Sequence, residues 1–573
     1  MHYLLKKTFE NRKYTPEFLQ EIENGHYNNL HNIDILADKL HELKENGKHI
    51  TIMSDFDSDG INSGITGFSG LSELGFNVSL FIPNPKEGYE ITSKTIDRML
   101  SEHPNTDAIL TCDVGITCFE GIDYAKSKGL TVLVTDHHME KERPFGLQPA
   151  DCIVDPMCEA DDYEHPRICG AFVLYQCLQY YANKYCDPFM QEQIKRLRVF
   201  AGIGTVSDVM PILYENRQLV REAIGIAKMV YFGGDDYIIS CIQGCEVYRR
   251  AFYGLHILIK SFAEAGKLKS PNHIDEEFFG YYLAPALNCV KRMDKDMKLA
   301  FGIFFGPNYE ENAKALVELN EERKELVKKH SAILEETKST QQYAPYVYFS
   351  EAPSGILGLL AMEIMSKTGM PTMVVRQEEN GKIHGSGRSP KWYKFLTNTI
   401  PHGFSPAGHN PAFGIKFIDL NEVNKMKEFL QMDATDVYEK GVADGTIATE
   451  TTYDFVIAQD GTGDITLDVV AFAEYIAELR YYRPFGEEFE APNILLKYDL
   501  SSINEDEDIK VMGTEKQHLK IIIDYGIEVL LWNQADKFDE VKKSDTLLVT
   551  GHLEESVFMG KHRISFVGTI IEE

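Results

Sequence analysis

The chain has 573 residues and is strongly acidic, with 58 Lys and Arg against 88 Asp and Glu and a formal net charge of −30. This length allows three or four domains, each with its own core. The acidic balance excludes a passive coat on nucleic acid, because such proteins bind phosphate through clustered Lys and Arg. Any nucleic-acid binding must therefore depend on local basic clusters and on metal ions.

The cysteines and the N-terminus indicate the cellular compartment in which we expect the protein. All 10 cysteines lie between Cys112 and Cys289 with no C-x-x-C pair, so neither a zinc knuckle nor a disulfide framework is indicated. The N-terminus carries no apolar export segment, and no apolar run approaches the roughly 18 residues that cross a bilayer. We expect a reduced, cytoplasmic and monomeric protein without a membrane partner.

Three short apolar runs follow a helical N-terminal segment at residues 1–38, and each run leads into aspartates. Residues 49–53 precede Asp55–Gly60 (DFDSDG), residues 108–111 precede Asp113, and residues 131–134 precede Asp136-His137-His138. Apolar runs separated by helical patterns predict a parallel α/β sheet, in which ligands sit at the carboxyl ends of the strands. The acids and histidines should therefore meet at one edge, within a domain at 39–306.

Carboxylates and neutral imidazoles together suit divalent ions such as manganese better than zinc, since no thiolate is needed. So many acids would repel each other unless cations lay among them. Two metal ions bridged by a carboxylate and activating a water would hydrolyse a phosphoester. A single strand-end Asp is more often a turn residue or a helix cap, so the prediction depends on the conjunction, which also includes Asp208 in residues 204–211 (GTVSDVMP).

In order and spacing, these four segments resemble the motifs of the DHH phosphoesterases, and within that family the RecJ-like exonucleases that degrade single-stranded DNA from the 5′ end. The resemblance implies two manganese ions, with magnesium possible, and Asp113 and Asp208 as bridges. The implied metal ligands are Asp57, Asp59, Asp113, His137 and Asp208. The implied neighbouring catalytic groups are Asp55, Asp136, which steadies the histidines, and His138, which faces the scissile phosphate.

The resemblance continues beyond the motifs. Residues 283–293 resemble a RecJ segment, with Lys291 where glycine is usual, and residues 307–343 resemble the linker helix between two lobes. The second lobe, residues 344–490, resembles the DHH-associated domain through its G-S-G-R-S and G-H-x-x-A-x-G segments, although Ala407 replaces a glycine. A nest of backbone N–H groups beside an Arg suits phosphate. The expected substrate-binding residues are Ser386, Gly387, Arg388, His409, Arg292 and Lys86, the last standing where the family has an arginine.

Residues 491–573 alternate apolar and polar positions in several short strands, which predicts a small OB-like barrel. Its candidate single-strand-binding residues are Trp532, Phe558, Lys561, His562 and Arg563. Trp532 taken alone is more often a core residue than a surface one.

Three functions compete. The first is a manganese-dependent 5′ to 3′ exonuclease that releases 5′-mononucleotides from single-stranded DNA in repair or recombination, with a helicase or single-strand-binding protein as a further partner. The second is a DHH phosphodiesterase for short oligonucleotides or cyclic dinucleotides, which needs no barrel. The third is a scaffold without activity, disfavoured because a binding module has no use for a repulsive acid cluster. The preference for DNA or RNA, the 5′-end chemistry and the processivity stay open.

Overall fold

The protein is described here by a computed structural model that covers residues 1–23, 29–88, 90–268, 270–408, 410–448, 452–513, 516–558 and 561–571. It forms two compact units. The larger unit comprises Tyr27–Met210 and Glu222–Thr449, and the smaller unit comprises Met1–His26, Pro211–Arg221 and Glu450–Glu573. No helix among these residues is long and apolar enough to cross a membrane.

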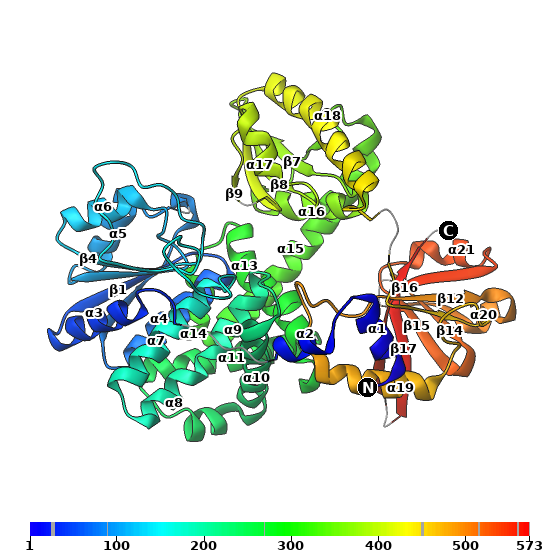
Figure 1. The fold of residues 1–573 in the computed structure, drawn as a ribbon, viewed down its shortest axis with the longest axis horizontal. Helices are drawn as coiled ribbons and strands as arrows, with labels where there is room; N and C mark the ends of the chain where they lie inside the picture. Colours follow the sequence, from blue (N-terminus) through cyan, green and yellow to red (C-terminus); the bar gives the residue numbers. More distant parts are fainter. Residues whose placement is uncertain are drawn as a thin grey trace. The chain divides into compact units, whose positions relative to one another are not determined.

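The larger unit begins with a parallel five-stranded sheet in the order β2-β1-β3-β4-β5 (Figure 1). The central strands are buried apolar runs, as expected where helices cover both faces of a sheet. Helices α3, α4 and α7 lie on one face and α5 and α6 on the other. The strands are β1 (His49–Ser54), β2 (Asn77–Phe81), β3 (Ala108–Cys112), β4 (Thr131–Thr135) and β5 (Cys152–Val154). The helices are α3 (Ile33–Glu45), α4 (Ser58–Glu73), α5 (Ser93–Glu102), α6 (Phe119–Ser127) and α7 (Gly170–Tyr185).

The chain then becomes helical. The long helix predicted after residue 307 is confirmed as α15 (Tyr309–Thr337), which packs against α11, α13 and α14 and leads to the second lobe. Residues 188–207 form two helices, α8 and α9, which are separated at Leu197. The helices before the linker are α8 (Pro188–Arg196), α9 (Arg198–Ser207), α10 (Tyr214–Cys241), α11 (Glu246–Glu264), α12 (Glu276–Phe278), α13 (Ala284–Arg292) and α14 (Lys298–Phe305).

The second lobe holds a five-stranded mixed sheet in the order β6-β7-β8-β10-β9. Helix α18 packs on one face and α16 on the other (Figure 1). The strands are β6 (Val347–Phe349), β7 (Thr372–Gln377), β8 (Ile383–Arg388), β9 (Ala407–Gly408) and β10 (Ala412–Phe417). The helices are α16 (Leu357–Thr368), α17 (Phe395–Thr399) and α18 (Leu420–Asp444).

The smaller unit is built on a seven-stranded sheet in the order β11-β12-β16-β17-β15-β14-β13. Its strands are β11 (Phe455–Ala458), β12 (Ile494–Asp499), β13 (Ile509–Met512), β14 (His518–Ile523), β15 (Ile527–Leu531), β16 (Thr546–Phe558) and β17 (Lys561–Ile570). Its helices are α1 (Tyr3–Asn11), α2 (Pro16–Glu21), α19 (Val469–Leu479), α20 (Glu505–Asp508) and α21 (Phe538–Val541).

The N-terminal segment belongs to this smaller unit. Leu4, Leu5 and Phe9 of α1 lie in one apolar core with the strands, and Arg12 binds Asp454 through two hydrogen bonds of 2.7 Å. We expected a separate segment at 1–38 and a barrel beginning at 491. The unit instead takes in residues 1–26 and begins again at 450, because contacts between the two ends of the chain have no signature in local sequence.

Candidate metal centre

The strand-end acids meet at one edge of the parallel sheet. Asp55, Asp113 and Asp136 each directly follow the last residue of β1, β3 or β4, and these three strands are neighbours. Parallel strands place their carboxyl ends at the same edge, so all three carboxylates converge there. Asp208 joins them from the C-terminus of α9.

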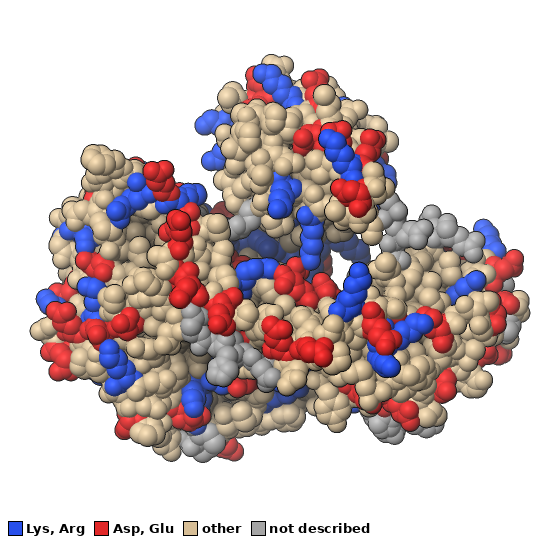
Figure 2. Space-filling view, in the orientation of Figure 1, with Lys and Arg blue, Asp and Glu red and all other residues tan. Residues whose placement is uncertain are grey.

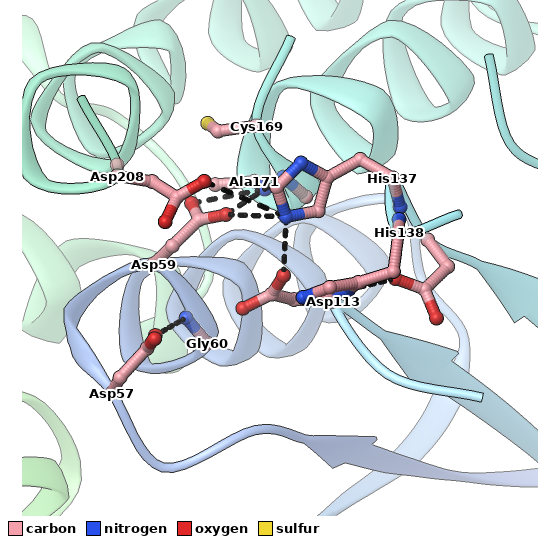
Figure 3. A network of polar contacts seen from close by, with 12 residues as sticks. Asp57, Asp59, Gly60, Asp113, His137, His138, Cys169, Ala171 and Asp208 are labelled. Carbon is pink, nitrogen blue, oxygen red and sulfur yellow. Dashed lines mark hydrogen bonds and ion pairs between the residues drawn. The ribbon is translucent and has the colours of Figure 1, made fainter. Parts of the chain in front are cut away.

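His137 lies at the centre of this cluster (Figure 3). Its Nε2 is 3.0 Å from Asp113 Oδ1, 3.7 Å from Asp208 Oδ2 and 3.8 Å from Asp59 Oδ2. The ligand atoms fall into three overlapping groups, each within 4.8 Å, and all five predicted metal ligands belong to them. The groups are Asp113, His137 and His138; Asp59, His137 and Asp208; and Asp55, Asp57 and Asp113.

The N-terminus of helix α7 holds the Asp59 carboxylate in place through hydrogen bonds. The backbone N–H groups of Gly170 and Ala171, in the first turn of the helix, donate to the Asp59 carboxylate at 2.7 and 3.3 Å. The positive end of the helix dipole favours a carboxylate there. Glycine is required at two positions, since a Cβ on Gly170 would lie 2.5 Å from Asp113 Cβ and one on Gly204 would lie 2.3 Å from Asp59 Oδ1.

Burial and mutual repulsion raise the pKa values of these acids. Burial first, and then the charge of Asp57, raise the pKa of Asp59 to about 6. The same causes hold the pKa values of Asp113 and Asp208 well above the usual range, with Asp59 as the nearest repelling charge. Asp55 Oδ1 is buried and accepts no hydrogen bond from the described residues. Oxygen donors of this kind beside an imidazole fit divalent cations such as manganese or magnesium.

Asp136 and His138 form a hydrogen-bonded pair next to these ligands. Asp136 Oδ1 lies 2.8 Å from His138 Nδ1, and Asp136 also accepts from the backbone N–H groups of Ile116 and His137. Burial alone would lower the pKa of His138, but the hydrogen bond to Asp136 and the nearby acids raise it to about 9. His138 is partly exposed.

Two residues at the centre adopt left-handed backbone angles that favour glycine. Asp113 has a φ of 61°, and Val209, which follows Asp208, has a φ of 54°. Such a conformation is a genuine outlier for a β-branched residue and costs about 1 to 3 kcal/mol. Strain of this kind gathers at functional sites, where the surrounding structure enforces it.

Three arginines gather beside the acids. Arg292 ends α13, Arg323 lies on the linker helix α15, and Arg388 ends β8. Burial and the charges of the other two lower the pKa of Arg292 to about 10. None of the three has an Asp or Glu of the described residues within ion-pair distance; Arg323 instead donates to Asn320 Oδ1 (3.0 Å) and Arg388 to the carbonyl of Gly387 (2.8 Å). The cluster is suited to an anion.

The other predicted substrate residues have different outcomes. Ser386 and Gly387 lie on β8 next to Arg388, and Lys86 is exposed and paired with Asp294 at 3.4 Å. His409 lies outside the described residues. Sequence reasoning did not assign Arg323 a role, since its position relative to Arg292 depends on how the helices pack.

The smaller unit leaves the predicted single-strand-binding surface partly open. Trp532 is 43% exposed and meets His518 edge to face at 4.8 Å, so the prediction that it is more often core is wrong. Arg563 Nη1 is 2.8 Å from Glu528 Oε1, and Glu528 also lies 3.2 Å from Lys520 Nζ. The side chains of Phe558, Lys561 and His562 lie outside the described residues.

Comparisons with known proteins show which families the chain resembles. Residues 49–203 match the model of the DHH family, N-terminal domain, and residues 463–568 match that of the RecJ OB domain. The chain is 26% identical over 586 residues to the single-stranded-DNA-specific exonuclease RecJ of Bacillus subtilis, with 99% of this chain and 64% of that protein covered. The chain therefore resembles RecJ proteins, with one region similar to the DHH family and another similar to the RecJ OB domain. The RecJ of Thermus thermophilus is 27% identical, over 59% of this chain and 45% of its own length.

Solved structures show the same fold. The crystal structure of Thermus thermophilus RecJ in complex with Mn2+ aligns with a TM-score of 0.71 at 20% identity, covering 100% of this chain and 76% of the other. An exonuclease RecJ bound to manganese aligns with a TM-score of 0.54 at 23% identity, over 71% of this chain and 95% of the other. This RecJ-like chain spans less than two thirds of the length of the two curated relatives named above, 64% and 45%.

Proposed function

We propose that this RecJ-like chain is a metal-dependent exonuclease that hydrolyses single-stranded DNA from the 5′ end to 5′-mononucleotides. The observation that carries the proposal is the pairing of two complementary clusters in one unit. The carboxylates around His137 are suited to cations, and the guanidinium groups of Arg292, Arg323 and Arg388 are suited to an anion. Hydrolysis of a phosphodiester uses metal ions to activate the attacking water and cationic side chains to bind the phosphate.

In this proposal, two manganese ions would be held by Asp57, Asp59, Asp113, His137 and Asp208, with Asp113 and Asp208 as the ligands that would serve both ions and Asp55 beside them; magnesium is the alternative. When bound, such ions lower the pKa of a water and stabilise the charge that develops on the phosphoryl oxygens. The hydrogen bonds from Gly170 and Ala171 orient Asp59 before any substrate arrives.

The remaining residues position the phosphate. Arg388 and Arg292 bind its oxygens together with Ser386 and the Gly387 backbone, and Lys86 approaches the 5′ end. His138 is hydrogen-bonded to Asp136 and faces the scissile phosphate as a hydrogen-bond donor. Arg323 supports Arg292 and adds a charge to the same pocket.

Binding of longer strands is assigned to the smaller unit, where the exposed Trp532 offers a surface for base stacking. The match to the RecJ OB domain supports this assignment. It also disfavours the second candidate, a phosphodiesterase for short oligonucleotides or cyclic dinucleotides, which has no need for such a domain. A monomer that works with a helicase or a single-strand-binding protein completes the proposal.

A substrate comparison separates the two candidates. Initial rates are measured with manganese on a 5′-phosphorylated 20-nucleotide strand, the same strand annealed to its complement, a dinucleotide and a cyclic dinucleotide. An exonuclease hydrolyses the single strand and spares the duplex and the cyclic compound. Faster hydrolysis of the cyclic dinucleotide than of the strand would contradict the proposal, and the Asp113→Asn variant controls for contaminating nucleases.

A further inference from the structure

Three basic side chains form a row across the sheet of the second lobe. In the antiparallel register, Arg376 of β7 pairs with His384 of β8, which pairs with Lys416 of β10. Residues directly opposite each other on adjacent strands point to the same face of a sheet. The three side chains therefore project together from one face.

This face also presents the residues proposed to bind the substrate. Side chains alternate between the two faces, so His384, Ser386 and Arg388 share a face along β8. The side chain of Phe413 lies on the opposite face, in the core that α18 covers, and a Cβ on Gly387 would point to that same face. The row is thus continuous with Ser386 and Arg388.

The β10 side of this face is open. Helix α16 packs over β7 and β8, and the β8 residues His384, Ser386 and Arg388 are half-buried. On β10, however, Gly414 and Lys416 are exposed. A Cβ added to Gly414 would approach nothing closer than two backbone oxygens at 3.9 Å. Ser386 and Gly414, which are opposite each other, make a low floor between the row and Arg388.

Two cations of the row, Arg376 and Lys416, are not paired with acids among the described residues. Arg376 donates only to the carbonyl of Ala352, at 3.4 Å, and neither Arg376 nor Lys416 has an Asp or Glu of the described residues within ion-pair distance. His384 is held between Ser354 Oγ at 2.9 Å and Glu378 Oε1 at 3.5 Å. Acidic side chains are spread among basic ones over the visible face of the molecule (Figure 2), and acids outnumber bases by 88 to 58. Like charges on adjacent strands repel each other. The unpaired Arg376 and Lys416 therefore indicate a site for an anionic ligand, which would offset this repulsion.

We propose that Arg376 and Lys416 bind an internucleotide phosphate of single-stranded nucleic acid, in a track that runs along β8 from Arg388. The proposal rests on the nuclease function proposed above and extends its substrate contacts. His384, fixed by Ser354 and Glu378, forms the base of this second phosphate site.

The spacing assigns the two sites to different phosphates. His384 and Arg388 are four residues apart on one strand, which is about 13 Å. Consecutive phosphates of a stacked strand are only about 3.4 Å apart along its axis. The distance of about 13 Å therefore spans several nucleotides, and the two ends of the track contact different phosphates. Ser386 and Gly414, the described residues of the floor between them, carry no aromatic side chain for base stacking, so we expect binding there to be independent of sequence.

The test measures binding of a 5′-phosphorylated 20-nucleotide oligothymidylate against salt, with calcium in place of manganese under conditions where gels show no product. Each lost phosphate contact should flatten the log–log slope by about 0.7 and weaken binding about fivefold at 0.1 M salt. The Arg376→Gln/Lys416→Gln variant should therefore show a flatter slope and weaker binding. The charge-conserving Arg376→Lys/Lys416→Arg variant should keep the wild-type slope.

Two controls make the outcome decisive. Lys425→Gln removes a cation from α18, whose neighbouring Val423 and Met426 pack in the core on the other face of the sheet, and it should leave the slope unchanged. Hydrolysis of a 5′-phosphorylated dinucleotide, too short for the track, should be unchanged in the double glutamine variant. An unchanged slope in that variant, or an equal loss on the dinucleotide, overturns the track while leaving the nuclease proposal intact. A wild-type protein that binds no single strand overturns both.

Discussion

Replacing Asp113 by Asn should abolish hydrolysis and at the same time stabilise the metal-free protein. Asp113 is 2% exposed and faces Asp59, Asp57 and Asp55. Its pKa in the folded protein is raised, so the unfolded chain ionises first and stability is lost as pH rises from about 4 through the folded pKa. An amide of the same shape removes this loss.

The size of the effect follows from its neighbour. For Asp59, a pKa raised from 3.8 to about 6 corresponds to roughly 3 kcal/mol of lost stability at pH 8. Asp113 is equally buried and faces more acids, so the metal-free larger unit should become more stable in Asp113→Asn, and its melting temperature should rise. Losing a bridging ligand should cost several kcal/mol of transition-state stabilisation, which lowers the rate about 10²- to 10⁴-fold.

The assay pairs thermal melting in chelator at pH 6 and pH 8 with initial rates in manganese. The gain in stability should be larger at pH 8 than at pH 6. Asp436→Asn, which removes an exposed acid of α18 paired with Lys440, is the matched control and should change stability by less than about 1 kcal/mol. More than a tenth of wild-type activity, or lower metal-free stability at pH 8, would refute the reasoning.

Three further predictions concern other parts of the chain. Arg388→Ala should raise the KM for single strands without weakening manganese binding in calorimetry. Weaker manganese binding in this variant would contradict the proposal that Arg388 binds phosphate. Gly170→Ala should disrupt manganese binding, because its Cβ would lie 2.5 Å from Asp113 Cβ, whereas Gly225→Ala, with nothing within 4 Å, should bind normally. Arg12→Ala should lower the unfolding free energy of the smaller unit by about 2 kcal/mol, since it leaves the buried Asp454 unpaired; an unchanged denaturant midpoint of that unit would refute this.

The sequence predicted the parallel sheet and the acid cluster because both depend on local patterns. A buried strand is a short apolar run, and the acids directly follow such runs, so their convergence at one edge needs no knowledge of tertiary packing. Long helices and alternating strands were also accessible, as α15 and β14 show.

Features that depend on distant contacts were not predicted. Arg323 joins Arg292 and Arg388 only because three separate elements pack together, and each residue alone resembles an ordinary surface cation. The same holds for α1, whose Leu4 and Leu5 enter the core of strands 450 residues further along the chain. Trp532 directly follows the last residue of β15, so its exposure depends on which neighbouring elements cover that end of the strand, and local sequence does not show this.

The central claim is that this acid and arginine site removes nucleotides from the 5′ end of a single strand. The most direct measurement is a time course on strands labelled at the 5′ or the 3′ end, with manganese and with chelator. The 5′ label should appear at once as a mononucleotide, while the 3′ label shortens progressively, and chelator should stop both. Early release of the 3′ label as a mononucleotide, or products that persist in chelator, would contradict the claim.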